Sequence, residues 1–367
     1  MSATTLYEYI GNLHMHTPYS DGVGSHAEIA DAALIAGIDI VIVTDHNVLV
    51  QGVEGYYGDD ERGYILLLTG EEIHDQARMP QVNHFLVYGA EQELAQCARN
   101  PQELIDAVNV AGGMGFIAHP HDPPLDLVHE PPIPWVDWSV QRYTGLEIWN
   151  YMSSFKGLLP TWKQLLYAVF RPEEVMIGPY PETLALWDRL LTEGYRVIGI
   201  GNSDAHGTVY QVGLLRHVVF PYDFLFNCVN THLLLPQPLS GNWQSDKQAL
   251  YKALAQGNAF IGYDIPGSTR GFRFSANGQF GSTIMGGSIR LGPGVTLQVL
   301  APARCHIKII SGGKVVAESE GRENLTFTAQ TSGAYRAEVW QQYHGQERAW
   351  ILSNPIYIED NAYTTRT

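Results

Sequence analysis

Six histidines stand in short motifs that each follow a run of apolar residues, and this pattern constrains the fold more than any other feature. They are His14, His16, His46, His84, His119 and His206. Carboxylates stand in or beside the same motifs, namely Asp21, Asp45, Glu71, Glu72, Glu147 and Asp204. Histidine and carboxylate gathered where buried strands end form the donor set of a multinuclear metal site. The sequence therefore predicts a metallohydrolase.

Strand-like and helix-like segments alternate over the first 264 residues. Ser25 and Glu28 form a capping box that predicts a helix over 25–36, and further helices are expected over 101–110 and 182–192. Strands are predicted at 9–14, 38–44, 65–69, 85–89, 115–118, 145–149 and 196–201. Such alternation predicts parallel units in an α/β barrel or doubly wound sheet. The motif residues then fall at the C-terminal strand ends, where barrels build active sites.

Two segments interrupt this alternation, and the pattern changes after residue 264. Residues 122–134 are rich in proline, and residues 151–180 are rich in aromatic and aliphatic residues. Each segment is expected either to pack on the surface of the domain or to form a lid over the site. Residues 266–271 resemble a linker, and short strands without helices follow, with Ser311-Gly312-Gly313 as a hairpin turn. We expect a barrel domain over 1–265, with an insertion at about 151–180, and a β-sandwich over 270–367.

Individual motifs suggest individual roles. His14 and His16 share one face of a strand, because strand side chains alternate, and together can hold one divalent ion. Asp45 ends the most apolar strand; it could cap a helix or pair with a cation, but we favour a hydrogen bond from a ligating histidine. Either Glu71 or Glu72 can bridge two metals at a barrel mouth, and spacing alone leaves that choice open.

His121 and Asp122 follow His119 directly and belong either to a polar loop or to substrate binding. The sequence holds no Gly-x-Ser-x-Gly, no phosphate-binding Walker loop and no dinucleotide glycine motif. No motif in the sequence therefore supports a serine or cysteine nucleophile, and none supports a nucleotide cofactor.

Composition narrows the class of partner. A net charge of −16 argues against nucleic acid or an anionic membrane as partner. The three cysteines are an odd number without paired spacing, so we expect them to be reduced. No signal-peptide pattern begins the chain, and no apolar run reaches the length of a membrane span, so we expect a cytoplasmic protein.

The motifs Leu-His-Met-His-Thr, Thr-Asp-His, Gly-Glu-Glu, Ala-His-Pro and Ser-Asp-Ala-His, in this order, resemble the PHP superfamily (polymerase and histidinol phosphatase domains). The resemblance runs from about residue 13 to 206 and implies a distorted (βα)7 TIM-like barrel with two or three metals. It implies a first metal on His14, His16, Glu72 and Asp204. It implies a second on Glu72, His84 and His119, and a third on Asp21, His46 and His206. The family motif Gly-x-Glu selects Glu72 over Glu71.

The C-terminal region, ending in Trp350-Ile-Leu-Ser-Asn-Pro-Ile-Tyr-Ile, resembles a bacterial branch of carbaryl-hydrolase-like metallohydrolases. That branch joins a PHP barrel to a small β-sandwich, which is the two-domain organisation expected above.

We expect hydrolysis of a small phosphate ester by a metal-bound hydroxide, at a site with two or three zinc, manganese or iron ions. Asp45, His121 and His206 are the candidate catalytic residues, and Lys156 and Arg171 the candidate phosphate contacts. The aromatic residues of 151–180 suggest an apolar leaving group. A carbamate or carboxylic ester hydrolase with the same metal site is the alternative. A non-catalytic binding module is disfavoured, because a ligand stands at every expected position.

Overall fold

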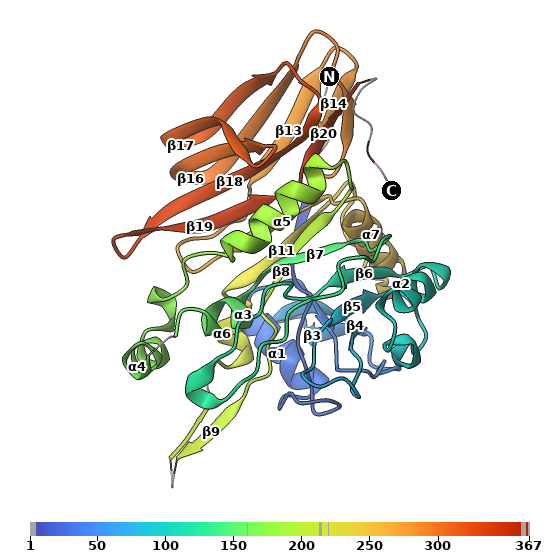
Figure 1. Cartoon of the computed structure of the whole chain (residues 1–367), viewed down its shortest axis with the longest axis vertical. Helices are drawn as coiled ribbons and strands as arrows, with labels where there is room; N and C mark the ends of the chain where they lie inside the picture. The colour runs from blue at the N-terminus through green and yellow to red at the C-terminus, as the bar shows by residue number, and fades with distance from the viewer. Residues whose placement is uncertain (1–4, 160, 213–214, 219, 361–364, 366–367) are drawn as a thin grey trace.

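The computed structural model describes residues 5–159, 161–212, 215–218, 220–360 and 365 (Figure 1). The helices are α1 His26–Ala36, α2 Pro101–Val110, α3 Tyr151–Lys156, α4 Trp162–Phe170, α5 Pro181–Thr192, α6 Tyr222–Phe226 and α7 Trp243–Ala255. The first twelve strands are β1 Tyr7–Asn12, β2 Ile40–Val43, β3 Gly55–Asp59, β4 Gly63–Ile73, β5 Phe85–Tyr88, β6 Met114–Ile117, β7 Gly145–Asn150, β8 Ile198–Asn202, β9 Val209–Val212, β10 Leu215–Val218, β11 Val229–Leu235 and β12 Ala259–Tyr263.

Local sequence signals set the limits of the first helix. The Ser25 side chain accepts from the Glu28 backbone N–H, and the Glu28 carboxylate accepts from the Ser25 backbone N–H at 2.8 Å. Gly37 ends α1 in the left-handed conformation, at φ 73°, which glycine adopts without strain. The predicted capping box is confirmed, and α1 is fixed between the two strands β1 and β2.

Strands β1, β2 and β4 pair in parallel, and so do β6, β7 and β8. Between these groups, β5 is antiparallel to both β4 and β6. An isolated parallel bridge joins Met15, beyond β1, to Ala205, beyond β8. The fold is thus mixed α/β with one large sheet, and a closed (βα)7 barrel remains a prediction.

The direction of β5 corrects one expectation. Motif residues were expected at the C-terminal ends of parallel strands, but His84 stands directly before β5. Since β5 runs opposite to β4 and β6, its N-terminal end lies at the same edge of the sheet as their C-terminal ends. His84 therefore reaches the same place from the other end of its strand.

The chain after β12 consists of strands: β13 Arg273–Gly278, β14 Gly281–Ile284, β15 Ser288–Arg290, β16 Val295–Ser311, β17 Lys314–Ala329, β18 Gly333–Tyr343, β19 Gln346–Ser353 and β20 Ile356–Glu359. β16 and β17 are each one long strand where two short ones were expected, with bulges between Leu300 and His306. The predicted hairpin is confirmed, since Ser311 pairs with Lys314 across Gly312 and Gly313.

These C-terminal strands have their own hydrophobic core yet share the large sheet. Phe272, Phe274, Leu297 and Val339 are fully buried in that core. β19 pairs with β12, so hydrogen bonds continue from one part into the other. Figure 1 shows α5 lying between the C-terminal strands and the strands β7 and β8. A separate β-sandwich and its boundaries remain predictions.

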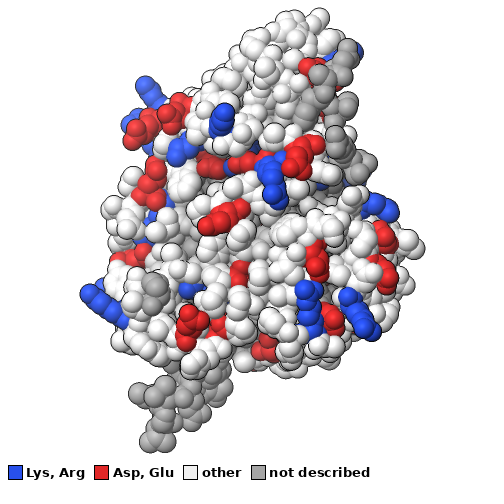
Figure 2. All heavy atoms as spheres, viewed as in Figure 1, with Lys and Arg blue, Asp and Glu red and all other residues white. Residues whose placement is uncertain are grey.

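None of the described helices is both long and apolar enough to cross a membrane. The face of the molecule seen in Figure 2 carries Lys and Arg side chains singly among Asp and Glu, without a continuous basic surface.

Candidate metal centre

The two histidines of the first motif lie just beyond β1, on one face of the chain. His14 and His16 flank Met15, which bridges to Ala205, and both are fully buried. Asp204 comes from the extension of β8 across that bridge. Its Oδ1 lies 3.3 Å from His14 Nε2 and 3.2 Å from His16 Nε2. Sequence positions almost 190 residues apart thus meet where two neighbouring strands end.

Glu72, near the end of β4, is the centre of the cluster and is 1% exposed. Five imidazole nitrogens lie within 3.2 Å of its two carboxylate oxygens. They belong to His14, His16 and His46 at Oε2, and to His84 and His119 at Oε1. A buried charge needs compensation, and five imidazoles around one carboxylate suit a ligand that bridges two cations.

A second, more exposed group lies beside this one. Asp21 Oδ1 is 3.3 Å from His206 Nε2 and 3.7 Å from His16 Nδ1, and Asp21 Oδ2 is 3.6 Å from His46 Nε2. The Asp21 side chain is 55% exposed, against 22% for His206. This group lies toward solvent, while the Glu72 group is enclosed.

All nine predicted metal ligands fall into groups whose ligand atoms lie within 4.8 Å of one another. The groups are His14, His16, Glu72 and Asp204; Glu72, His84 and His119; and His16, Asp21, His46 and His206. They share members and so form one cluster. Their roles as ligands remain proposals.

The sequence reasoning missed His74, which forms a further group with His46 and His84. It stacks on His84 with ring centroids 4.3 Å apart and is 5% exposed. Its available signal was the alternation along β4: His74 lies two residues after Glu72 and so faces the same side.

Glu147 on β7 orients residues of the cluster through hydrogen bonds. Its Oε1 lies 3.0 Å from His14 Nδ1 and accepts from the Asn202 amide, while its Oε2 accepts from the His119 backbone N–H and the Asn150 amide. A carboxylate on the second nitrogen of an imidazole fixes its tautomer and orientation. Glu147 stood out in the sequence as a motif carboxylate, but no role was predicted for it.

Asp45 has a different role from the predicted one. Among the described residues it accepts hydrogen bonds from the Thr17 backbone N–H at 2.7 Å, the Thr17 hydroxyl at 2.6 Å and the Ser20 hydroxyl at 2.7 Å. The expected bond from a ligating histidine is replaced by these loop contacts. Asp45 therefore holds the turn that carries Asp21, and it does not line the cavity described next.

The cluster opens into a cavity of about 980 Å³. Seven cluster residues line it, namely Asp21, His46, Glu72, His84, His119, Asp204 and His206. Lys156 lines it too, whereas the other candidate phosphate contact, Arg171, does not; the Arg171 side chain is 60% exposed and lies near Glu173 and Glu174. Arg171 directly follows α4 and lies apart from the cavity, so its contact with a phosphate remains a prediction.

His121 also lies apart from the cavity, and its catalytic role remains a prediction. Its Nδ1 lies 3.4 Å from the Thr183 hydroxyl of α5, and its side chain does not line the cavity. The residue next to it, Asp122, does line the cavity and pairs with Lys156. His206 is thus the candidate acid that remains beside the cluster.

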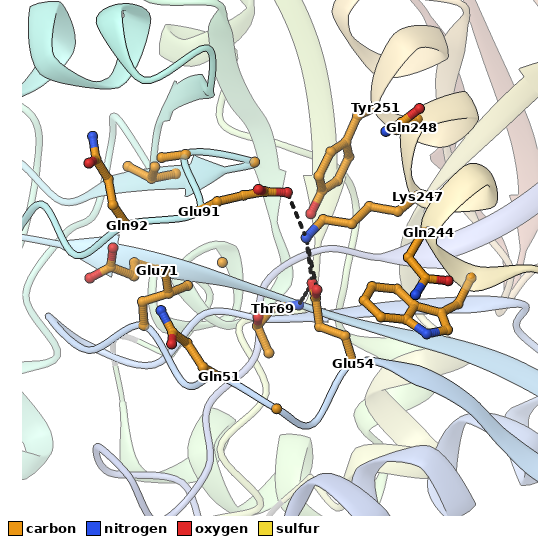
Figure 3. Close-up of a pocket in the computed structure, with 17 residues that line it drawn as sticks. Gln51, Glu54, Thr69, Glu71, Glu91, Gln92, Gln244, Lys247, Gln248 and Tyr251 are labelled. Atoms are coloured by element: carbon orange, nitrogen blue, oxygen red, sulfur yellow. Dashed lines mark hydrogen bonds and ion pairs between the residues drawn. The ribbon is translucent and has the colours of Figure 1, made fainter.

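Glu71 faces the other side of β4, because neighbouring strand residues point in opposite directions. It lines a separate pocket of about 640 Å³. Figure 3 shows Glu71 in this pocket with Glu54 and Lys247. Burial, with the nearby Glu93 carboxylate, raises the pKa of Glu71 to about 9. The alternation of side chains along β4 thus places Glu72 in the cluster and Glu71 in the separate pocket, a distinction that the sequence spacing left open.

Backbone strain gathers at the cluster. Asp204 and His119 have φ values of 58° and 26°, and Asn47 and Asn83, which adjoin His46 and His84, have 54° and 62°. Residues other than glycine rarely adopt this region, and such strain concentrates at functional sites.

The pKa values of histidines of the cluster are shifted, some upward and others downward. For His16, burial lowers the pKa, but the hydrogen bonds that its imidazole donates to the Asp204 and Glu72 carboxylates outweigh burial and raise the pKa to about 9. For His119, burial is likewise outweighed by Glu72, and the pKa rises to about 9. For His46 and His74, burial dominates and lowers the pKa to about 3 and about 4.

The donor set fits divalent metal ions. His84 Nε2 is buried without a hydrogen-bond partner among the described residues, although buried polar atoms are normally paired. Imidazole with carboxylate suits zinc, iron and manganese. The residues present therefore fit divalent metal ions, and the identity and number of these ions remain predictions.

Metal binding should release protons, because a ligating imidazole must be neutral. With pKa values of about 9, His16 and His119 carry protons in the metal-free protein at pH 7.5. For His14, burial is again outweighed, and the Asp204, Glu147 and Glu72 carboxylates raise the pKa well above its usual value. We therefore expect Zn²⁺ to displace about two to three protons at pH 7.5 and fewer above pH 9, with apparent affinity rising over that range. Calorimetry in buffers of different ionisation enthalpy measures the release; none at pH 7.5 would contradict the expectation.

Comparison with known proteins gives distant relatives. The uncharacterized protein MJ1587 of Methanocaldococcus jannaschii is 28% identical over 123 residues, which are 30% of this chain and 68% of that protein. A two-domain protein of Bacteroides vulgatus, described as containing a predicted PHP-like metal-dependent phosphoesterase, is 14% identical with a TM-score of 0.40, covering 95% of each chain. A candidate metal-dependent phosphoesterase of Bifidobacterium adolescentis is 16% identical with a TM-score of 0.31, covering 56% of this chain and 91% of its own.

A family model matches the N-terminal part of the chain. The matched stretch, residues 12–123, contains seven of the nine predicted ligands, from His14 to His119. Asp204 and His206 lie outside it and join the cluster only through the fold. The family matched over residues 12–123 is the PHP domain family.

Proposed function

We propose that this protein is a metal-dependent hydrolase that cleaves phosphate esters. The observation that carries the proposal is the buried Glu72 carboxylate with five imidazole nitrogens within 3.2 Å, opening into a cavity of about 980 Å³. The match of residues 12–123 to the PHP domain family supports it.

The chain would hold two or three ions, of zinc, manganese or iron. His14, His16, Glu72 and Asp204 would hold one, and Glu72 with His84 and His119 a second. Asp21, His46 and His206 would hold a third. Bound ions supply Lewis acidity toward the phosphoryl oxygens and make water acidic enough to be a nucleophile near neutral pH.

The protein's own residues would orient these groups and exclude water. Glu147 keeps the His14 ring in place through Nδ1, and Asn150 does the same for Asp204, since its amide donates to both Glu147 and Asp204 Oδ2. His206, with Nε2 near Asp21, would give a proton to the leaving group when two ions are bound. With three ions bound, that nitrogen would instead be a ligand.

A carbamate or carboxylic ester is the second candidate substrate. It is favoured by one observation: Lys156 is the one Lys or Arg among the described lining residues, and two carboxylates already pair with it. The cavity wall therefore offers no free cation for a phosphate.

The test is metal-dependent turnover. We expect the metal-free protein to gain activity toward p-nitrophenyl phosphate esters after addition of Mn²⁺ or Zn²⁺, and Asp204→Ala to lower kcat/KM by about 10³-fold. Asp60→Ala, which removes an exposed carboxylate in the turn between β3 and β4, at the opposite end of β4 from Glu72, should match the parent. Turnover of p-nitrophenyl carboxylic or carbamate esters alone would move the assignment to the second candidate. No turnover of any ester would refute the hydrolase.

A further inference from the structure

The cavity over the cluster combines two unlike surfaces. One consists of the cluster residues, and the rest is mainly apolar side chains of α3, α4 and the loops beside them. Met152 and Phe155 come from α3, Leu165 and Leu166 from α4, and Leu159 from the loop between them. A pocket of this volume is large enough for a substrate with a substantial apolar part.

The inner part of this apolar surface is firmly packed. Phe155 is 4% exposed, Leu159 1% and Phe220 6%. The rings of Phe155 and Phe220 meet edge to face with centroids 4.6 Å apart. Such packing holds the surface in one shape, so it can select among ligands by size and polarity.

Its outer part leaves large apolar side chains in solvent. Trp162 and Leu166 are each 58% exposed and Phe170 is 77% exposed, and all three line the cavity from α4. Apolar side chains gathered at the mouth of a cavity are a feature of binding sites, because a ligand removes them from water.

The one cation among the described residues of the cavity wall is already paired with two carboxylates. Lys156 is 8% exposed, and its ammonium lies 2.7 Å from Asp122 and 2.9 Å from Glu130. With two carboxylates to one ammonium, this triad repels a second anionic group. A nucleotide or bisphosphate would therefore find no partner for charges beyond the one at the cluster.

We propose that the substrate is an ester with a single charged or polar reacting group and a long apolar chain that lies along α3 and α4. The proposal rests on the proposed function for the reaction, but the apolar selectivity is a property of the cavity itself. The proposed substrates are alkyl and aryl esters, and nucleotides are excluded.

The test uses p-nitrophenyl alkyl phosphodiesters with methyl, butyl and octyl chains on the Mn²⁺-loaded full chain. The leaving group and charge are constant, so kcat/KM reports only the chain. We expect a rise of about 10- to 60-fold from methyl to butyl, since each buried methylene contributes up to about fourfold. Thymidine 5′-(p-nitrophenyl phosphate), with the same leaving group and charge, should do no better than the methyl ester. A flat series, or preference for thymidine, overturns the proposal.

Two exposed aromatic residues of α4 form a matched pair. Trp162 lines the cavity and Tyr167, 51% exposed, does not. We expect Trp162→Ser to lower the octyl-to-methyl ratio of kcat/KM by about tenfold and Tyr167→Ser to leave it within about twofold. Equal effects of both changes would overturn the proposal.

Binding separates this proposal from the proposed function. If no ester is hydrolysed, the hydrolase is refuted, and calorimetry with octylphosphonate and methylphosphonate still tests the cavity. At least about tenfold tighter binding of octylphosphonate, reduced by Trp162→Ser, supports the apolar site. Equal binding of the two overturns it.

Discussion

Glu72→Gln should lower kcat/KM by about 10³-fold and remove at least one bound metal ion per chain. The carboxylate contacts imidazoles at both of its oxygens, and a neutral amide can neither bridge two cations nor balance them inside the protein. Metal content by elemental analysis and kcat/KM against p-nitrophenyl phosphate esters measure the two effects on the same preparations.

Its neighbour provides the control. Glu71→Gln makes the same chemical change one residue earlier on β4, but its side chain faces the separate pocket. Because the pKa of Glu71 is about 9, its carboxyl is already neutral at pH 7.5, and an amide of the same shape should be tolerated. We expect metal content equal to the parent and kcat/KM within about twofold. If Glu71→Gln removed metal instead, the bridging role would belong to Glu71.

Most residues of the cluster could be predicted from the sequence because they stand at or near the ends of strands with a strong apolar signal. Strand ends that meet at one edge of a sheet bring such residues together whatever their separation in sequence. His84 shows the limit of this reasoning. His84 lies in the cluster although β5 runs antiparallel to its neighbours, because a histidine directly before an antiparallel strand lies at the same edge of the sheet.

The predicted site residues that lie apart from their expected partners are side chains whose contacts are set by loops and helix faces. Asp45 was known to be buried, but its partners Thr17 and Ser20 come from a turn whose path no periodicity encodes. His121 and Arg171 turn toward α5 and toward solvent, and their directions depend on the packing of whole elements. Glu147 lacked a role for the same reason, since its four partners come from three other segments and from β7 itself.

Arg336→Ala should lower the free energy of unfolding by about 3–5 kcal/mol, because it breaks a buried ion-pair network. Arg336 of β18 is 2% exposed and donates to both oxygens of Asp188 on α5, at 2.7 Å each, and to Glu338 Oε1 at 2.6 Å. Removing the guanidinium leaves two carboxylates without their shared cation where α5 meets the C-terminal strands. Urea unfolding followed by circular dichroism measures the loss.

Arg304→Ala is the matched control on β16. Its side chain is 81% exposed, and its Nε lies 4.0 Å from Glu323, so solvent screens the pair. We expect a change within about 0.5 kcal/mol. Equal small effects of both substitutions would mean that the Arg336 network adds little to stability. A large effect of Arg336→Ala alone, with metal content unchanged, would place the contact between α5 and β18 among the main stabilising contacts of this chain, independent of the metal centre.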